Sequence, residues 1–181
     1  MEDAEVMAQV RAGRVERLAV IFERHHLHLF NFFLRLTGRR GASEDLVQEV
    51  FLRLLRYRAS YRPGAPFAPW MWRIARNVHH DHLQTQRPHQ LLDELPEGIP
   101  DGQDGADVHV MRDQEALHLW RAMNRLDPAK RELLLLSRNS ELAYQDLARL
   151  MACSVGALKV QVHRALKELK TVFAELQGGM P

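Results

Sequence analysis

The stretch FAPWMWRIARNVHHDHLQTQR, residues 67–87, has the periodicity of one α-helix with two chemically different sides. The apolar residues Phe67, Met71, Ile74 and Val78 share one side, which we expect to lie in a core. The opposite side carries Trp72, Arg73, Arg76, His80, Gln84 and Arg87. An indole among guanidinium groups suits stacking on unpaired bases while the cations hold phosphates. The alternative is a solvated cationic face whose Trp packs inward.

Charge is distributed unevenly along the 181 residues, although the formal net charge is only +2. Residues 52–88 contain seven arginines and one acid, whereas residues 91–107 contain six acids and no Lys or Arg. A role with nucleic acid must therefore rest on this distribution and not on net charge. The single cysteine, Cys153, excludes an intrachain disulfide and fits a reducing compartment. With no signal peptide or membrane span in the sequence, we expect a cytoplasmic protein.

Helical periodicity continues on both sides of this stretch, and no strand pattern competes with it. Before it, the sequence predicts one helix over residues 15–36, which Gly38 ends, and a second that begins near Ser43 as N-cap. Residues 88–107 are acidic, contain Pro and Gly, and have no sustained periodicity, which favours a flexible linker. The fold class we expect is all-α, with two small helical domains: a bundle over residues 1–87 and a second domain over residues 108–181.

The second domain ends in a predicted helix-turn-helix. After helices over residues 110–126 and from Asp127-Pro128 onward, a short helix over residues 144–151 precedes a longer one that begins at Ser154. The apolar residues of the long helix form one stripe, which we expect to be buried: Val155, Leu158, Val162, Leu166, Leu169 and Phe173. The other side of this helix carries Gly156, Lys159, Val160, His163, Arg164 and Lys167. Ala152 stands where such a turn often has Gly. The alternative is an ordinary helical hairpin with a solvated cationic face.

The string His79-His80-Asp81-His82 invites comparison with metal-dependent phosphohydrolases. Successive helical residues diverge by about 100°, however, so these side chains do not share one face. No nucleophile elbow or glycine-rich phosphate loop occurs. We therefore expect no metal, no cofactor and no catalytic residues.

Three segments in this order resemble the extracytoplasmic-function (ECF) sigma factors of bacterial RNA polymerase. They are DLVQEVFLRL from Asp45, WMWRIARN from Trp70, and SVGALKVQVHRALKEL from Ser154. The resemblance covers most of the chain. It implies a subunit that directs core polymerase to specific promoters and stabilises strand opening, with no enzymatic activity of its own.

The resemblance also implies roles for individual residues. The polymerase-binding edge would consist of Asp45, Gln48, Glu49 and Leu52, docking on the clamp helices of the largest subunit, with the flap as a further contact. The minus-ten element would be read by Tyr61, Arg62, Gly64, Trp70, Arg73, Arg76, Asn77, His80 and Arg87, with the loop over residues 61–66 holding a flipped-out base. The minus-thirty-five element would be read by Ser154, Gly156, Lys159, Val160, His163, Arg164 and Lys167.

The partners implied are core polymerase, promoter DNA and an anti-sigma factor, with no insertion into a membrane. Ala152, Val160 and Gln161 depart from the family's usual pattern in the last segment. Two other functions fit parts of the sequence. A stand-alone DNA-binding regulator would use only the helix-turn-helix, and a metal-dependent phosphohydrolase would use the histidine string.

Overall fold

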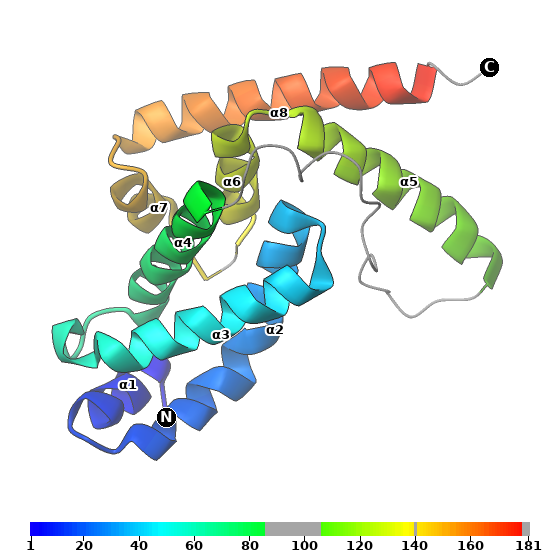
Figure 1. Cartoon of the computed structure of the whole chain (residues 1–181). Helices are drawn as coiled ribbons and strands as arrows, with labels where there is room; N and C mark the ends of the chain where they lie inside the picture. Colours follow the sequence, from blue (N-terminus) through cyan, green and yellow to red (C-terminus); the bar gives the residue numbers. More distant parts are fainter. Residues whose placement is uncertain (86–105, 140, 179–181) are drawn as a thin grey trace. The chain divides into compact units, whose positions relative to one another are not determined.

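The computed structural model describes residues 1–85, 106–139 and 141–178, and every regular element in these residues is helical (Figure 1). The chain divides into two compact units, Met1–Glu97 and Gly98–Pro181. The predicted all-α fold class is confirmed. The predicted linker falls almost wholly outside the described residues; its last two residues, Ala106 and Asp107, instead begin a helix.

Four α-helices and two short 3-10 helices form the described part of the first unit. They are α1 (Asp3–Arg11), η1 (Val15–Arg17), α2 (Leu18–Thr37), α3 (Arg40–Arg56), η2 (Arg58–Ser60) and α4 (Phe67–Thr85). Helix α1 has no counterpart in the sequence-based prediction. Its Val6, Met7 and Val10 are fully buried, so α1 is an integral part of the core.

Helices α2 and α3 form a hairpin with a very short connection. Gly38 ends α2 as predicted: its φ of 68° is left-handed, and its N–H donates to the Leu34 carbonyl at 2.8 Å. Helix α3 begins at Arg40, so the prediction of Ser43 as N-cap is wrong. Ser43 is buried inside the first turn, and its hydroxyl donates to the Arg39 carbonyl at 2.7 Å. The hydroxyl is thus used to bond back along the helix.

Helix α4 buries more of its circumference than one stripe. The predicted core residues Phe67, Met71, Ile74 and Val78 are all buried. Trp72, which the sequence placed on the polar side, is only 1% exposed and meets Phe32 of α2 edge-on, with ring centroids 5.1 Å apart. That placement was wrong because α4 packs against α3 while its aromatic side chains also reach α2. A helix with two neighbours buries two adjacent stripes.

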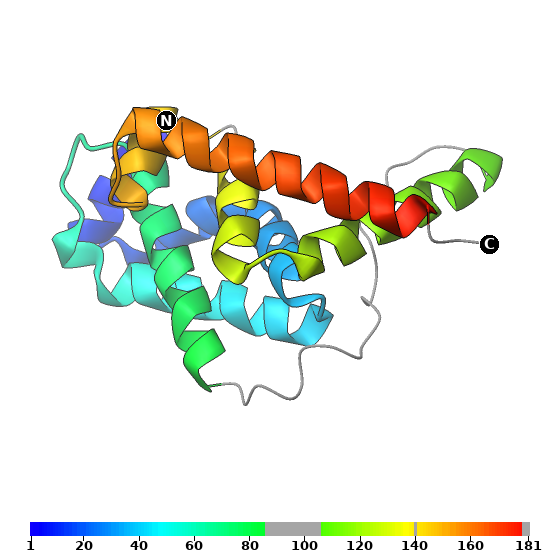
Figure 2. The same cartoon turned by 90° about the horizontal axis from the view of Figure 1, so that it is seen from above.

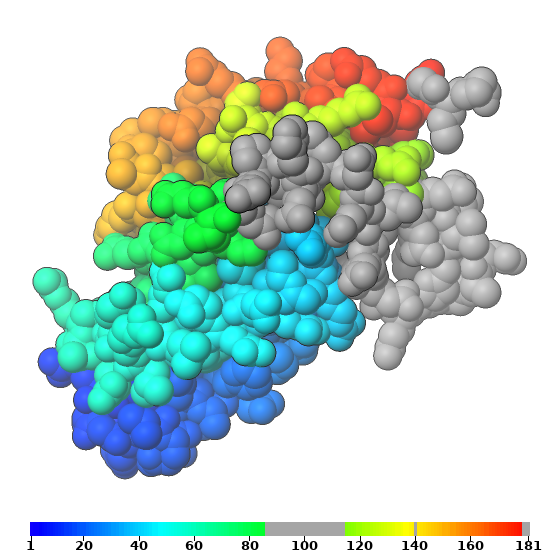
Figure 3. Space-filling model, in the orientation of Figure 1, coloured from blue at the N-terminus to red at the C-terminus, as the bar shows by residue number. Residues whose placement is uncertain are grey.

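One arginine joins α3 to α4. The Nε of Arg53 donates to Glu49 on the preceding turn at 2.6 Å, and a terminal nitrogen donates to Asp81 of α4, also at 2.6 Å. The hydrogen bond to Glu49 and the charge of Asp81 raise the pKa of Arg53, against an opposing effect of burial. Because it bonds to both helices, Arg53 helps to hold α3 and α4 together. In the space-filling view, these two helices form neighbouring parts of the surface of this unit (Figure 3).

In the second unit, the long C-terminal helix packs against each of the others (Figure 2). The elements are α5 (Ala106–Arg125), α6 (Pro128–Ser137), α7 (Tyr144–Leu150) and α8 (Val155–Gly178). Asp127 caps α6 as expected, accepting from the Ala129 N–H at 2.9 Å. The guanidinium of Arg131 donates to the carbonyls of Met123 and Asn124 and so satisfies the C-terminal end of α5.

The turn between α7 and α8 is strained at one residue. Ala152 has a φ of 52°, the left-handed region that an L-residue with a Cβ adopts at a cost of about 1–2 kcal/mol. This conformation explains why a glycine is common at this position of a helix-turn-helix. Ser154 then caps α8, since its hydroxyl accepts from the Ala157 N–H at 3.1 Å.

We expect Ala152→Gly to raise the free energy of unfolding of the second unit by about 0.5–1 kcal/mol. The relief of left-handed strain outweighs the greater freedom of glycine in the unfolded chain. Urea denaturation of the full chain, followed by hydrogen exchange in α7 and α8, measures the change. Ala174→Gly, at an exposed position within α8, should instead lower stability by about 0.5–1 kcal/mol. A loss of stability in both variants would contradict the strain at Ala152.

We expect Arg53→Ala to lower the stability of the first unit by about 1 kcal/mol, because two charge-assisted hydrogen bonds of a largely buried guanidinium are lost. The matched control is Glu44→Ala, which removes the more exposed ion pair with Arg40 and should cost less than about 0.5 kcal/mol. Chemical denaturation compares the two variants. Equal losses would show that Arg53 does not join the helices.

Candidate nucleic-acid interface

The exposed side of α4 carries most of the residues that the sequence singled out there. Arg73 and Asn77 are exposed, while Trp70, Arg76 and His80 are half-buried. On the helix, Trp70, Arg73 and Asn77 follow one another at intervals of three and four residues, so they form one stripe. We call these three residues the α4 stripe. Arg87 lies outside the described residues.

Trp70 takes the place in this stripe that the residue pattern alone gave to Trp72. Its ring contacts two aromatic rings beneath it, those of Tyr61 and Phe67, at centroid distances of 5.1 and 6.1 Å. One part of the indole is thus held by the core while the rest remains accessible. A partly supported, partly open indole is suited to stacking on an unpaired base.

The loop before α4 is built on a buried tyrosine. Tyr61 is only 1% exposed, and its hydroxyl donates to the carbonyl of Ala65. Burial, with a smaller effect of Asp3, raises the pKa of the Tyr61 phenol, so the group stays protonated and able to donate. The expectation that Tyr61 itself contacts DNA is therefore not met by this placement: the ring supports the loop from within the core.

The outer part of the same loop remains accessible. Arg62 and Gly64 are exposed, and Gly64 has a φ of 80°, which a residue with a Cβ adopts only under strain. The Ala65 N–H donates to the Arg62 carbonyl at 3.0 Å and closes the turn. The loop thus presents one cation and one bare backbone position next to the α4 stripe.

The four residues predicted to bind polymerase lie along one edge of α3. Asp45, Gln48 and Leu52 are exposed, and Leu52 is 56% exposed, which is high for a large apolar side chain. Glu49 is less free, because it accepts the hydrogen bond from Arg53. The edge therefore combines an open acid, an amide and an unburied leucine.

The helix-turn-helix presents its predicted face in full. Gly156, Lys159, Val160, His163, Arg164 and Lys167 are all exposed, as is the capping residue Ser154. The opposite side of α8 buries Leu158, Val162 and Ala165. The first two belong to the predicted stripe, whose other members, Val155, Leu166, Leu169 and Phe173, are only half-buried. Ala165 was missed, because its small side chain gave a weak signal. A helix with this division can enter a major groove with its cationic side.

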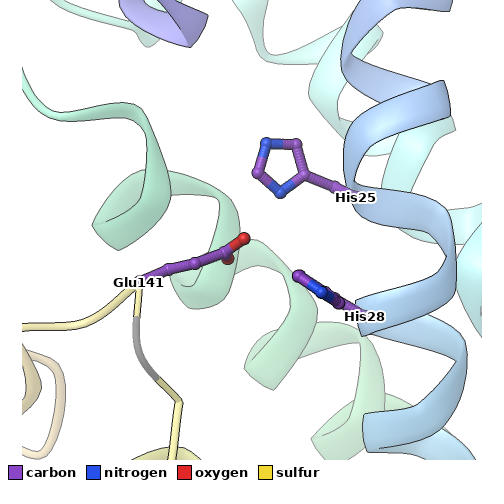
Figure 4. A group of neighbouring side chains, drawn as sticks. All are labelled: His25, His28 and Glu141. Carbon is purple, nitrogen blue, oxygen red and sulfur yellow. The ribbon is translucent and has the colours of Figure 1, made fainter.

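The histidines that the structure describes do not gather into a site within either unit. His79 is buried on the core side of α4. The pKa of His82 is lowered, mainly by burial and to a smaller extent by His79 and Arg39, so the imidazole of His82 is neutral at neutral pH. On α2, His25 and His28 project from successive turns, whereas Glu141 comes from the second unit (Figure 4). Within the described residues of the first unit, these two histidines alone fall short of the three protein ligands of a catalytic zinc.

Two charged groups with structural roles escaped the sequence analysis. Arg53 counted as part of the basic block, yet it is bound by two carboxylates. Asp3 lies on α1 and accepts a hydrogen bond from His25 of α2 at 2.7 Å. The pairing of Arg53 had a local signal in the sequence, since Glu49 lies four residues earlier. The pairing of Asp3 had no such signal, because His25 is 22 residues away.

The two units match two known protein families. Residues 21–89 match Sigma-70 region 2, and residues 117–169 match Sigma-70, region 4. The chain is 29% identical over 174 residues to RNA polymerase sigma factor CarQ of Myxococcus xanthus, covering 94% of this chain and 97% of that protein. It is 30% identical over 143 residues to ECF RNA polymerase sigma factor EcfG of Rhodopseudomonas palustris, covering 78% and 77% respectively.

Solved structures share the fold. CnrH, solved in complex with the cytosolic domain of CnrY, superposes with a TM-score of 0.72 at 20% identity, covering 98% of this chain and 99% of that one. The sigma factor RpoE of Bartonella quintana, solved with the anti-sigma factor NepR, gives a TM-score of 0.68 at 22% identity, with coverage of 87% and 96%.

None of the described helices is both long enough and apolar enough to cross a membrane. A regulator with only a helix-turn-helix would leave the region 2 match unexplained, and a phosphohydrolase would leave both matches unexplained. The two sigma regions stand in the expected order along the chain. Both relatives align over most of their length; CarQ is an RNA polymerase sigma factor, and EcfG is an ECF RNA polymerase sigma factor. The chain belongs to the ECF family of RNA polymerase sigma factors.

Proposed function

We propose that the α4 stripe and the loop over residues 61–66 capture unpaired bases of the minus-ten element. The observation that supports this assignment is the position of Trp70, whose half-buried indole rests on the rings of Tyr61 and Phe67. Asn77 offers an amide that can donate to and accept from a base edge. Arg73 and Arg62 supply charge for the flanking phosphates.

Base capture explains how a protein without catalytic groups opens DNA. Flipping a base out of a duplex costs a few kcal/mol, and stacking on an aromatic ring returns about 1–3 kcal/mol per base. A surface that is already formed holds the open state without further ordering of its own side chains. The sigma factor therefore shifts an equilibrium and catalyses no bond change.

We expect Trp70→Ala and Asn77→Ala to reduce promoter opening about tenfold or more, with a smaller effect on binding to closed duplex, because each removes a contact made only to unpaired bases. Permanganate reactivity of unpaired thymines in a reconstituted holoenzyme measures opening, and binding at low temperature measures the closed complex.

The matched control is Trp72→Phe, since Trp72 is buried against Phe32. This variant should lower stability while leaving the ratio of open to closed complex near that of the wild type. Equal losses of opening and of duplex binding in Trp70→Ala would refute base capture.

The exposed face of α8 is proposed to read the minus-thirty-five element as duplex DNA. Lys159 and Arg164 suit phosphate or guanine contacts, and Val160, which is 48% exposed, suits a thymine methyl group. Ser154, Gly156, His163 and Lys167 complete this surface. The unit containing α8 would thus fix the register of the factor on the promoter while the first unit holds the opened bases.

Replacing Lys159 or Arg164 by Ala should weaken binding to the upstream element by about 1–3 kcal/mol if a bidentate base contact is lost. The control is Lys130→Ala, which removes a positive charge that is already paired with Glu168 at 2.6 Å. Once transcription start sites have been mapped after overexpression of the protein, fluorescence anisotropy with a duplex of the upstream element measures binding by all three variants. An equal loss with Lys130→Ala would indicate a general effect of charge.

The exposed edge of α3 is proposed to dock on the clamp helices of the largest polymerase subunit. Asp45, Gln48 and the unburied Leu52 provide charged, polar and apolar contacts on one side of a helix. The second unit would reach the flap, with the segment over residues 88–107 joining the domains over residues 1–87 and 108–181. An anti-sigma factor is a further proposed partner, since two structural relatives were solved with a protein bound. All these partners act in the bacterial cytoplasm, where we place the protein.

A further inference from the structure

Helix α1 contacts three of the elements that hold the base-capture region, by which we mean the α4 stripe together with the loop over residues 61–66. It contacts α2, η2 and α4, and its three buried apolar residues close one end of the core. Two polar tethers accompany this packing. One joins Asp3 at the start of α1 to His25 of α2, and the other joins Arg11 at its end to the backbone of η2.

The first tether leads to the base-capture region through aromatic rings. The Nε2 of His25 donates to the Asp3 carboxylate at 2.7 Å, and the imidazole is only 5% exposed. Its ring lies 5.5 Å from the ring of Phe67, which contacts Trp70 at 6.1 Å. The orientation that Asp3 gives to the imidazole therefore determines the surface on which Phe67, and through it Trp70, can rest.

The second tether leads to the loop itself. The Nε of Arg11 donates to the carbonyl of Ala59 at 3.3 Å, two residues before Tyr61. Tyr61 in turn carries the loop through its bond to Ala65 and contacts both Phe67 and Trp70. Both ends of α1 thus converge on the same aromatic cluster, Tyr61, Phe67 and Trp70.

We propose that α1 is a positioning element for promoter opening: the Asp3–His25 and Arg11–Ala59 hydrogen bonds hold the aromatic cluster so that Trp70 is presented to an unpaired base. The proposal rests on the role of Trp70 given above. Asp3, His25 and Arg11 act through other residues and need not touch DNA. A side chain held by packing and by hydrogen bonds loses less entropy when a base stacks on it.

The test uses Asp3→Asn and His25→Phe in a holoenzyme reconstituted with bacterial core polymerase. His25→Phe keeps a ring against Phe67 but cannot bond to Asp3, and Asp3→Asn weakens the same bond from the other side. We expect each to reduce promoter opening about threefold to tenfold, the range of one net hydrogen bond. Core binding and closed-complex binding should stay within about twofold of the wild type.

The matched control is Arg24→Gln. Arg24 also bonds to Asp3, but its side chain is 43% exposed. Its replacement leaves the contact between the rings of His25 and Phe67, which leads to Trp70, in place. This variant should open promoters like the wild type. If Arg24→Gln lowers opening as much as Asp3→Asn, the effect is one of general stability and the proposal is overturned.

Double variants separate positioning from stability. Asp3→Asn combined with His25→Phe should be no worse than His25→Phe alone, because both act through one bond. In a Trp70→Ala background, His25→Phe should cause no further loss of opening. Additive losses in either combination would overturn the proposal. Normal promoter opening by Asp3→Asn would overturn it too. This variant is the safer of the two, because Asp3 is less buried than His25 and its replacement is less harmful to folding.

The outcome also distinguishes this proposal from the one it rests on. If Trp70→Ala opens promoters normally, base capture by Trp70 is refuted and positioning falls with it. If Trp70→Ala impairs opening but Asp3→Asn and His25→Phe do not, only the role of α1 is refuted.

Discussion

Helix α4 must bury one side among its neighbours and keep the adjacent side accessible, and this double requirement sets the arrangement of the first unit. Its two tryptophans serve the two sides separately, since Trp72 lies in the core against Phe32 and Trp70 rests on the core with part of its ring open. The α2–α3 hairpin and α1 supply the surfaces that make this possible. The core thus supports the α4 stripe from beneath, which is what the proposed capture of unpaired bases requires of it.

Much of the fold follows from local sequence signals. The apolar stripe of α4, the end of α2 at Gly38 and the cap at Asp127 were all predicted from local signals and confirmed. The two errors have different causes. Trp72 was misplaced because a helical pattern reveals the period of burial but not the number of neighbours, and Ser43 was misplaced because a hydroxyl can bond back within a helix as readily as it caps one.

The candidate site was predictable to a different degree in each unit. On α8 the cationic and apolar faces are fully separated, so residues such as Lys159 and Arg164 were placed on the correct side from sequence. In the first unit the aromatic residues are mixed with core residues, and Tyr61 proved to be buried. The link between Asp3 and His25 lay beyond any local signal, because only tertiary folding brings α1 to α2.

The double pairing of Arg53 changes what the basic block of the first unit means for DNA binding. A cation that neutralises a phosphate releases a condensed counterion, and the number released sets how steeply affinity falls with ionic strength. Arg53 is already neutralised by Glu49 and Asp81, so it has no phosphate to neutralise and no counterion to release. Under the DNA-binding role proposed above, we therefore expect the affinity of the arginine-rich segment to depend less steeply on salt than its formal charge suggests. Stacking, which salt does not screen, would then supply a larger share of that affinity.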